Sequence, residues 1–287
     1  MRGEQKVSLA RCCRLFGISR QSLYQAQSRA AKCAEQMKRI KPLVEQVRRK
    51  MPRLGTRKLY HLLKAEFEEL GIKIGRDAFF DFLRTEHLLI RPKKNYTKTT
   101  ESRHWLRKYP NLVKQFQVSR AEEVFVSDIT YLRSSQRTHY LSLVTDAYSR
   151  RIMGYHLSDD VSAESVVKAL RMALEKRIGT KELIHHSDRG LQYCSAVYQS
   201  ELRRHLVKSS MTDAGGDCYQ NAIAERINGI LKQEFLIETC QTGKELEVLV
   251  KESIKTYNNC RPHLSLDMET PNATHEKACE SNFTGSD

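Results

Sequence analysis

Hydrophobic and polar residues alternate between residues 122 and 158, and this period of two predicts three consecutive β-strands. The three segments are EVFVSDITYL, HYLSLVTDAYSR and RIMGYHLS, joined by short polar connections. Short connections are typical of antiparallel neighbours, so we predict an antiparallel meander. In the first strand, alternation places Phe125, Ser127 and Ile129 on one face and Val124, Val126, Asp128 and Thr130 on the other.

After residue 160 the hydrophobic spacing becomes helical. SAESVVKALRMALEKR predicts a helix with Ser162 as its N-cap. ELIHHSD follows as a short buried strand, SAVYQSELRRHL as a helix, VKSSMT as a short strand, and a longer helix is predicted from about Tyr219 to Leu236. The order β-β-β-α-β-α-β-α predicts an α/β fold, in which helices flank a mixed five-stranded sheet.

The N-terminal part is predicted to be all-helical. In SLARCCRLFGISRQSLYQAQ, Gly17 separates two short helices and Ser19 is a natural N-cap for the second. This pattern favours a helix-turn-helix segment over residues 1–38, with Arg20 and Gln21 able to reach DNA. A plain helical hairpin is the alternative.

Residues 39–92 predict a second helical module. Apolar residues recur at helical spacing in IKPLVEQVRRKM, TRKLYHLLKAEF and GRDAFFDFLRTEHLL. A helix-turn-helix or winged-helix module would fit, and Arg57 and Lys58 are its candidate DNA contacts. A solvated charged face would give the same pattern.

Three further segments complete the expected organisation. Residues 93–120 have weak periodicity and many basic residues, which indicates a linker that orders along DNA, with Lys93 and Lys94 as candidate contacts. Trp105 could instead anchor onto the next domain. Residues 121–240 would form the core, and residues 241–287 a C-terminal helix, from Gly243 to Asn259, followed by a frayed polar tail.

Charge is distributed unevenly along the 287 residues. Residues 1–120 contain 29 Lys and Arg against 10 Asp and Glu, a net charge of +19, whereas the remainder contains 20 against 24, a net charge of −4. This asymmetry indicates an N-terminal part that neutralises phosphates. A basic protein without a polyanionic partner is the alternative.

The eight cysteines are scattered, without a CxxC pair or zinc-site spacing, so we expect reduced and mostly buried thiols. No apolar run approaches the ~18 residues of a membrane span. The N-terminus MRGEQKVSLA lacks the apolar centre of a signal peptide. A cytoplasmic protein is therefore expected.

Three carboxylates stand out by their positions. Asp128 lies mid-strand among apolar residues, Asp188 ends a buried strand, and Glu225 lies within a predicted helix. Burying such acids is costly unless a cation compensates them. Oxygen ligands without a His/Cys shell favour Mg²⁺ or Mn²⁺, and two ions about 3.5–4 Å apart would suit phosphoryl transfer. Asp146, also at a strand end, is a competing ligand.

Five stretches, in chain order, carry a family resemblance: VSDITYL, VTDAYSRRIMGYHLS, HHSDRGLQY, NAIAERINGILKQE, and YNNCRPHLSL followed by TP. They resemble the DDE transposases of bacterial insertion sequences, specifically the second reading-frame product of the IS-three group. The resemblance covers nearly the whole chain. It implies a catalytic domain similar to that of retroviral integrases, with the RNase H-like fold.

Carried over residue by residue, the resemblance makes Asp128, Asp188 and Glu225 the catalytic and metal-binding triad. The chain has 36 residues between Asp188 and Glu225, one more than the family usually has. The extra residue falls in the Gly-rich stretch SMTDAGGDCYQN, where a loop absorbs it. We retain Glu225 because the neighbouring Ala224 cannot bind a metal.

Polar residues around the triad are candidates for supporting roles. Lys232 and Asn228 lie on the helical face of Glu225, where they could hold a phosphate. His186 and Arg189 flank Asp188 as supporting or DNA contacts. Asn221 is expected to cap the helix, and Arg261 and His263 to fix the tail; ordinary surface polarity is the alternative for the first four.

The resemblance implies a transposase that cleaves element ends with metal ions and joins the freed 3′-hydroxyl to target DNA. A catalytically silent DNA-binding regulator and a metal-dependent nuclease without joining activity are the alternatives. Expected partners are double-stranded DNA, further copies of the chain and an upstream-frame protein, since no leucine-zipper heptad is obvious. The expected location is the bacterial nucleoid.

Overall fold

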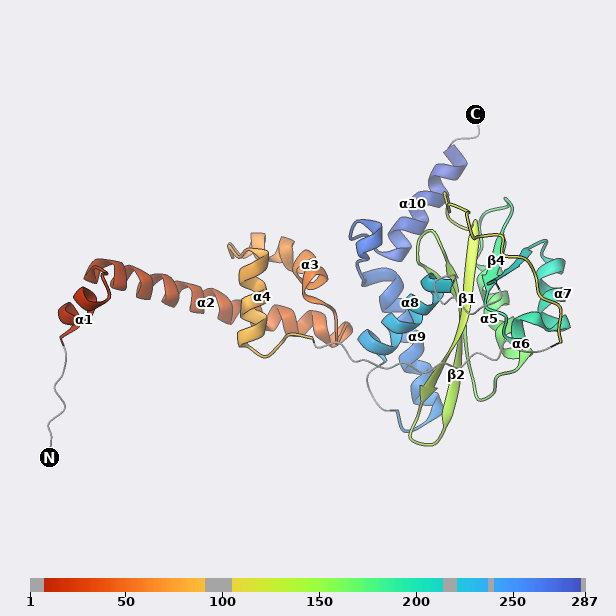
Figure 1. The fold of residues 1–287 in the computed structure, drawn as a ribbon, viewed down its shortest axis with the longest axis horizontal. Helices are drawn as coiled ribbons and strands as arrows, with labels where there is room; N and C mark the ends of the chain where they lie inside the picture. The colour runs from red at the N-terminus through yellow and green to blue at the C-terminus, as the bar shows by residue number, and fades with distance from the viewer. Residues whose placement is uncertain (1–7, 91–104, 214–220, 237–239, 285–287) are drawn as a thin grey trace. The chain divides into compact units, whose positions relative to one another are not determined.

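The computed structural model describes residues 8–90, 105–213, 221–236 and 240–284 (Figure 1). The chain divides into two compact units. The helical unit comprises Met1–Arg49 and Leu62–Leu89, and the core unit comprises Lys50–His61 and Ile90–Asp287. None of the described helices combines the length and apolarity that crossing a membrane requires.

The first helical turn forms as predicted, but the second helix is much longer. Helix α1 spans Leu9–Leu15, Gly17 has a φ of 67°, and α2 spans Arg20–Lys50. The Ser19 side chain accepts a hydrogen bond from the Ser22 backbone N–H at 3.0 Å, which confirms the predicted N-cap. Residues 28–39, SRAAKCAEQMKR, contain neither Gly nor Pro and favour helix, so α2 continues across the expected boundary at residue 38.

Two shorter helices follow, α3 at Thr56–Glu69 and α4 at Arg76–Thr85. Most of the predicted apolar positions are buried and the rest half-buried, and the rings of Phe67 and Phe79 pack edge to face at 5.7 Å. Residues 8–90 contain helices and no strand, so the winged-helix alternative lacks its wing. The all-helical prediction for this part is confirmed.

The core unit contains the predicted mixed sheet of five strands in the order β3-β2-β1-β4-β5 (Figure 1). β1 pairs antiparallel with β2 and parallel with β4; β2 pairs antiparallel with β3, and β4 parallel with β5. The elements are β1 (Val124–Arg133), β2 (Thr138–Asp146), β3 (Ile152–Ser158), α5 (Ala163–Glu175), β4 (Ile184–Ser187), α6 (Leu191–Cys194), α7 (Ala196–Arg204), β5 (Lys208–Met211) and α8 (Ala222–Ile230). The predicted α/β class, a mixed five-stranded sheet flanked by helices, is confirmed.

Each face of the sheet has its own hydrophobic cluster, as the alternation in β1 predicts. Phe125 and Ile129 pack on the side of α5 and α7, whereas Val124 and Val126 pack with Ala224 of α8. Gly154 of β3 permits close packing of α5, because a Cβ there would overlap the Ala169 carbonyl. Asp128 shares the α8 face with Val124 and Val126.

Residues 105–120 lie against the core unit, so the expectation that this segment orders only on DNA is wrong for its described part. Leu106 packs on one cluster and Val113 on the other. The Leu112 backbone N–H donates to the Ser210 side chain at 2.9 Å. Trp105 is 91% exposed and does not anchor the segment within this chain.

The C-terminal residues are more ordered than predicted. After α8, the short η2 segment (Leu231–Phe235) is followed by α9 (Gly243–Cys260), η3 (Leu264–Leu266) and α10 (Pro271–Thr284). Helix α9 agrees with the predicted helix, but the expected frayed tail is a helix in residues 271–284. His275 of α10 is fully buried against the sheet.

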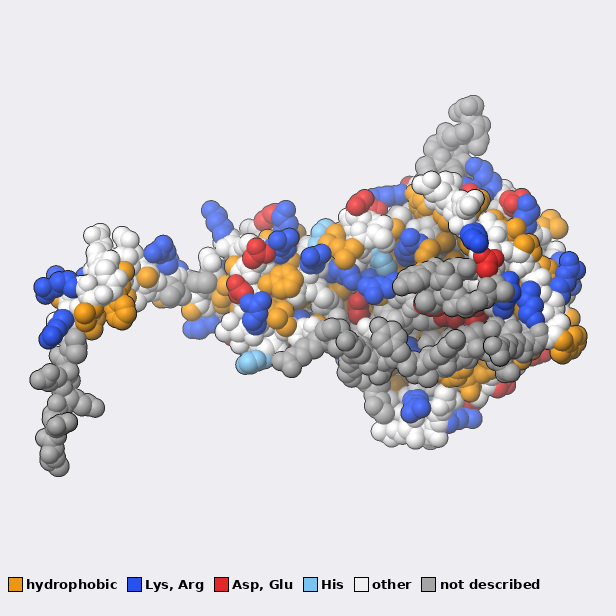
Figure 2. Space-filling view, viewed as in Figure 1, with side chains coloured by type: hydrophobic (Ala, Val, Ile, Leu, Met, Phe, Trp, Pro, Cys, Tyr) orange, Lys and Arg blue, Asp and Glu red, His pale blue; other side chains and the backbone are white. Residues whose placement is uncertain are grey.

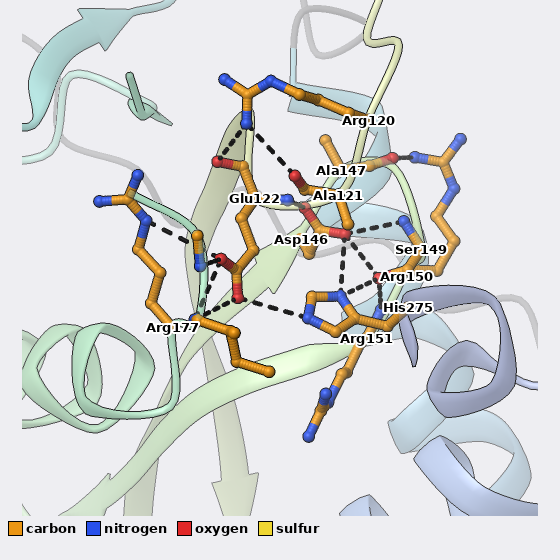
Figure 3. Close-up of polar contacts among 12 residues, drawn as sticks. Arg120, Ala121, Glu122, Asp146, Ala147, Ser149, Arg150, Arg151, Arg177 and His275 are labelled. Atoms are coloured by element: carbon orange, nitrogen blue, oxygen red, sulfur yellow. Dashed lines mark hydrogen bonds and ion pairs between the residues drawn. The ribbon is translucent and has the colours of Figure 1, made fainter. Parts of the chain in front are cut away.

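His275 ties α10 to the sheet through a buried ionic network. Figure 3 shows its ring between two carboxylates, Glu122 before β1 and Asp146 at the end of β2. Nε2 lies 3.4 Å from Glu122, and Nδ1 lies 3.5 Å from Asp146 and 3.0 Å from the Ser149 hydroxyl. Burial disfavours the charged ring, but the two acids more than offset burial and raise the pKa of His275 above 6.5.

We predict that His275→Gln destabilises the fold in a pH-dependent manner. A raised folded-state pKa stabilises the fold below pH 6.5, and that stabilisation is lost as the pH rises through the folded pKa. The variant should lose about 3 kcal/mol of unfolding free energy at pH 6 and less at pH 9, measured by urea denaturation.

His61→Gln is the matched control, because His61 is exposed on α3. Its unfolding free energy should stay within about 0.5 kcal/mol of the wild type. A loss in His275→Gln of equal size at both pH values would contradict a charged His275.

Candidate metal-binding carboxylate site

Asp128 lies in the middle of β1, where its carboxylate faces unfavourable surroundings. Burial, then the charge of Asp188 and that of Glu225, raise its pKa to about 7. The Asn228 side-chain amide offsets part of this by donating a hydrogen bond to Oδ2 at 2.7 Å. The carboxylate is therefore held in place by this hydrogen bond, while burial and the neighbouring acids disfavour its charge.

Asp188 is brought beside Asp128 by the parallel pairing of β1 and β4. Val124 is paired with Ile184, and Val126 with His186. Continuing this register by two residues aligns Asp128 with Asp188, just beyond the carboxyl end of β4. The Gly190 backbone N–H donates to Asp188 Oδ1 at 2.9 Å and fixes the carboxylate.

Glu225 approaches from the first turn of α8, where the helix dipole favours an anion. Partial burial, followed by the charge of Asp188, raises its pKa. Asn221 stands at the N-cap position but makes no capping hydrogen bond, contrary to the prediction. Its buried amide instead donates to the Ser127 carbonyl at 3.0 Å, which docks the start of α8 next to Asp128.

The charge of Asp188 raises the pKa of both Asp128 and Glu225, which places the three predicted acids in one electrostatic neighbourhood. They do not form a tight cluster. Among the described residues, three potential ligands with atoms all within 4.8 Å of one another are found at Glu122, His275 and Cys279. The triad carboxylates are thus electrostatically coupled without meeting that distance.

The donor set at this region fits a hard divalent cation. The neighbouring imidazoles of β4 are unsuitable ligands, because both are buried and hydrogen-bonded. His185 Nε2 bonds to the Ser127 and Tyr198 hydroxyls at 2.7 and 2.8 Å, and burial lowers its pKa to about 3. His186 Nδ1 bonds to the Ser210 hydroxyl at 2.9 Å, so direct DNA contact by this buried ring is excluded. Oxygen ligands alone favour Mg²⁺-like ions over Zn²⁺.

Lys232 also lies near Asp128, although a regular α-helical period does not predict its position. It lies in η2, where the helix widens to π-type turns and changes register. Partial burial lowers the pKa of Lys232, and the nearby Asp128 opposes this change. A positive charge therefore stands close to the first carboxylate.

The other candidate DNA contacts are placed unevenly. Arg20, Gln21 and Arg57 are exposed, and Figure 2 shows many Lys and Arg side chains on the surface of the helical part. Lys58 is buried, and Arg189 Nε donates to the Thr212 carbonyl at 2.6 Å. Lys93 and Lys94 lie outside the described residues.

Asp146, the competing ligand, has a structural task. Its fully buried carboxylate accepts hydrogen bonds from the Glu122 and Ser149 backbone N–H groups, both at 2.9 Å, and faces His275 (Figure 3). These partners compensate the charge. The pattern of strand ends alone gives no means of telling this acid from Asp188.

The sequence also gives no sign of the role of Glu234. Its carboxylate accepts two hydrogen bonds, at 2.7 and 2.8 Å, from the guanidinium of Arg261. Arg261 is 1% exposed, so this pair joins η2 to the end of α9. Arg261 therefore fixes the C-terminal part as expected, and its partner is the Glu234 carboxylate in η2.

Comparison with known proteins defines the class. Two family models, both described as integrase core domain, match residues 118–216 and 206–271. The HTLV-2 integrase catalytic core domain, solved in complex with magnesium, aligns with a TM-score of 0.43 and 17% identity, covering 54% of this chain and 97% of that one. The two integrase-core matches together span residues 118–271 of the chain.

Sequence relatives give the family. An IS600 insertion-element protein of 31 kDa from Shigella sonnei is 32% identical over 271 residues, 92% of this chain and 97% of its own length. Transposase InsF of insertion sequence IS3A from Escherichia coli is 34% identical over 189 residues, 66% of this chain and 64% of its own. The chain belongs to the IS3-type DDE transposases, which are DNA polynucleotidyl transferases and depend on a divalent metal.

We predict that Asn221→Ala destabilises the core unit, because the buried Ser127 carbonyl would lose its hydrogen-bond donor. The expected loss is about 1–3 kcal/mol of unfolding free energy, measured by urea denaturation. Asn259→Ala, which removes an exposed amide on α9, should cost less than about 0.5 kcal/mol. Equal losses in both variants would contradict the docking role of Asn221.

Proposed function

We propose that Asp128, Asp188 and Glu225 are the metal-binding catalytic triad of this transposase, and that they hold two Mg²⁺ or Mn²⁺ ions. The observation that best supports this proposal is the raised pKa of Asp128 and Glu225, to which the neighbouring triad carboxylates contribute. Three acids brought together from β1, the end of β4 and α8 are costly without a cation. Bound ions would act as Lewis acids and lower the pKa of the attacking water or hydroxyl.

The protein's own groups would position this chemistry. The Asn228 amide orients Asp128, and the Gly190 N–H orients Asp188. The ammonium of Lys232, close to Asp128, would bind a non-bridging oxygen of the reacting phosphate. Asn228 is occupied by Asp128, so we assign it to orienting the carboxylate rather than to holding a phosphate.

The proposed reaction has two phosphoryl transfers. In the first, a water oxygen attacks the phosphorus at the end of the element, the bond to the 3′-oxygen breaks, and a 3′-hydroxyl is freed. In the second, this hydroxyl attacks a phosphorus of the target DNA and displaces another 3′-oxygen. Neither step requires a covalent enzyme intermediate.

DNA recognition is proposed to lie mainly in the helical segments over residues 1–38 and 39–92. Arg20 and Gln21 are exposed at the start of α2, where they can reach base edges. Oligomerisation on DNA and an upstream-frame partner remain proposals. Binding titrations with element-end and scrambled duplexes test whether these residues recognise sequence. The double variant Arg20→Ala/Gln21→Ala should lose the preference for the element-end duplex. An unchanged preference would refute this role.

We predict that Asp128→Asn and Glu225→Gln each abolish metal-dependent strand cleavage, by at least about 10³-fold, while DNA affinity stays within about twofold. The assay uses labelled element ends and a target plasmid, with binding measured separately in EDTA. Glu247→Gln, an exposed substitution on α9, is the control and should keep full activity.

Cleavage that survives in either triad variant would refute the assignment. Cleaved ends without joined product from the wild type would instead favour the nuclease alternative. A wild type that binds ends but never cleaves them, with any divalent metal, would favour the silent regulator.

A further inference from the structure

A second polar site lies in the core unit, on a part of α8 that the triad does not use. It is a pocket of about 300 Å³. Its wall includes apolar residues of α8, such as Ile223 and Ile227. Its polar lining is basic and comes from four parts of the chain: Lys58, Arg150, Arg226, Arg261 and His263.

The positive charge of this basic pocket is only partly neutralised. No Asp or Glu is among its described lining residues. Glu234, just outside the lining, pairs with Arg261 and lies 3.7 Å from Lys58. Arg226 forms no ion pair within the described part of the chain, and Arg150 uses one N–H group on the Ala147 carbonyl (Figure 3).

The pKa shifts of two lining residues agree with an excess of positive charge. Burial, followed by the charges of Arg261 and Arg226 outweighing Glu234, lowers the pKa of Lys58 to about 8. Burial, followed by the charges of Arg261 and Lys58, lowers the pKa of His263 to about 3. Several cations thus repel one another around a space that holds no anion of the protein.

His263 gives an independent sign of a missing ligand. The ring is 6% exposed and packs edge to face on Tyr257 at 5.4 Å. Its buried Nε2 atom has no hydrogen-bond partner among the described residues. Buried polar atoms without partners are rare in folded proteins. In the tautomer that carries its proton on Nε2, this atom would donate a hydrogen bond to an anionic oxygen in the pocket.

We propose that the basic pocket binds a phosphate group of the DNA backbone, separate from the phosphate that reacts at the triad. The guanidinium groups match phosphate oxygens, and the apolar wall would contact the adjoining sugar. The proposal rests on the DNA-directed function proposed above. Since α8 carries both Glu225 and Arg226, a phosphate in the pocket would fix this helix, and with it the third carboxylate, relative to the DNA.

Binding of the full chain to a fluorescein-labelled random-sequence duplex tests the proposal, with EDTA present so that metal chemistry plays no part. Arg226→Gln should weaken binding at least about tenfold and reduce the slope of log K against log salt by about 0.9. Arg226→Lys should keep the slope with intermediate affinity. Arg203→Gln, at an exposed position on α7 outside the pocket, should change affinity less than about twofold.

Equal affinities and slopes for Arg226→Gln and Arg203→Gln would overturn the proposal. A second result would also overturn it. If inorganic phosphate protects the wild type but not Arg226→Gln against unfolding, while the two proteins bind DNA with equal affinity, the pocket holds a free anion and not a DNA phosphate. Failure of the triad assignment looks different: metal-dependent cleavage would survive in Asp128→Asn or Glu225→Gln, and these binding curves would not change. Urea denaturation verifies that the variants are folded.

Discussion

Repulsion between three neighbouring carboxylates is the interaction on which the proposed metal site of the core unit depends. Parallel pairing of β1 with β4 aligns Asp128 with Asp188, and α8 adds Glu225 to the same neighbourhood. The fold holds these charges together through fixed partners, namely the Asn228 amide and the Gly190 N–H. The proposed binding of a divalent cation at these carboxylates would relieve their repulsion, in agreement with the metal dependence of the family.

Helix α8 links the chemistry to DNA. Asn221 docks its start onto β1, Glu225 and Asn228 serve the carboxylate side, and Arg226 lines the basic pocket. The pair of Arg261 with Glu234 holds the following η2 segment against α9. A phosphate bound in the pocket would therefore act on the position of Glu225 through a single rigid element. The buried His275 network lies at the end of β2, around Asp146. None of its residues belongs to the predicted triad or lines the basic pocket.

The regular part of the fold was accessible from sequence because its signals are local. Alternation in β1 identifies both faces, and the carboxylates of the predicted triad lie where strand ends and helix spacing indicate. Contacts between distant segments were not accessible. The π-type turns that move Lys232 and the burial of His275 by α10 depend on tertiary packing. Asp146 and Asp188 look alike in sequence, and the contacts of Asp146 with His275 and Ser149 become visible only in the folded chain.

The central claim is that Asp128, Asp188 and Glu225 grip divalent metal at one place. Replacing Mg²⁺ by Fe²⁺ and adding ascorbate and peroxide generates hydroxyl radicals at the bound ion, which cut the backbone nearby. The account predicts cuts in β1, directly after β4 and in α8, suppressed by excess Mg²⁺ and absent in Glu225→Gln. Cuts confined to one segment, or insensitive to Mg²⁺, would contradict it.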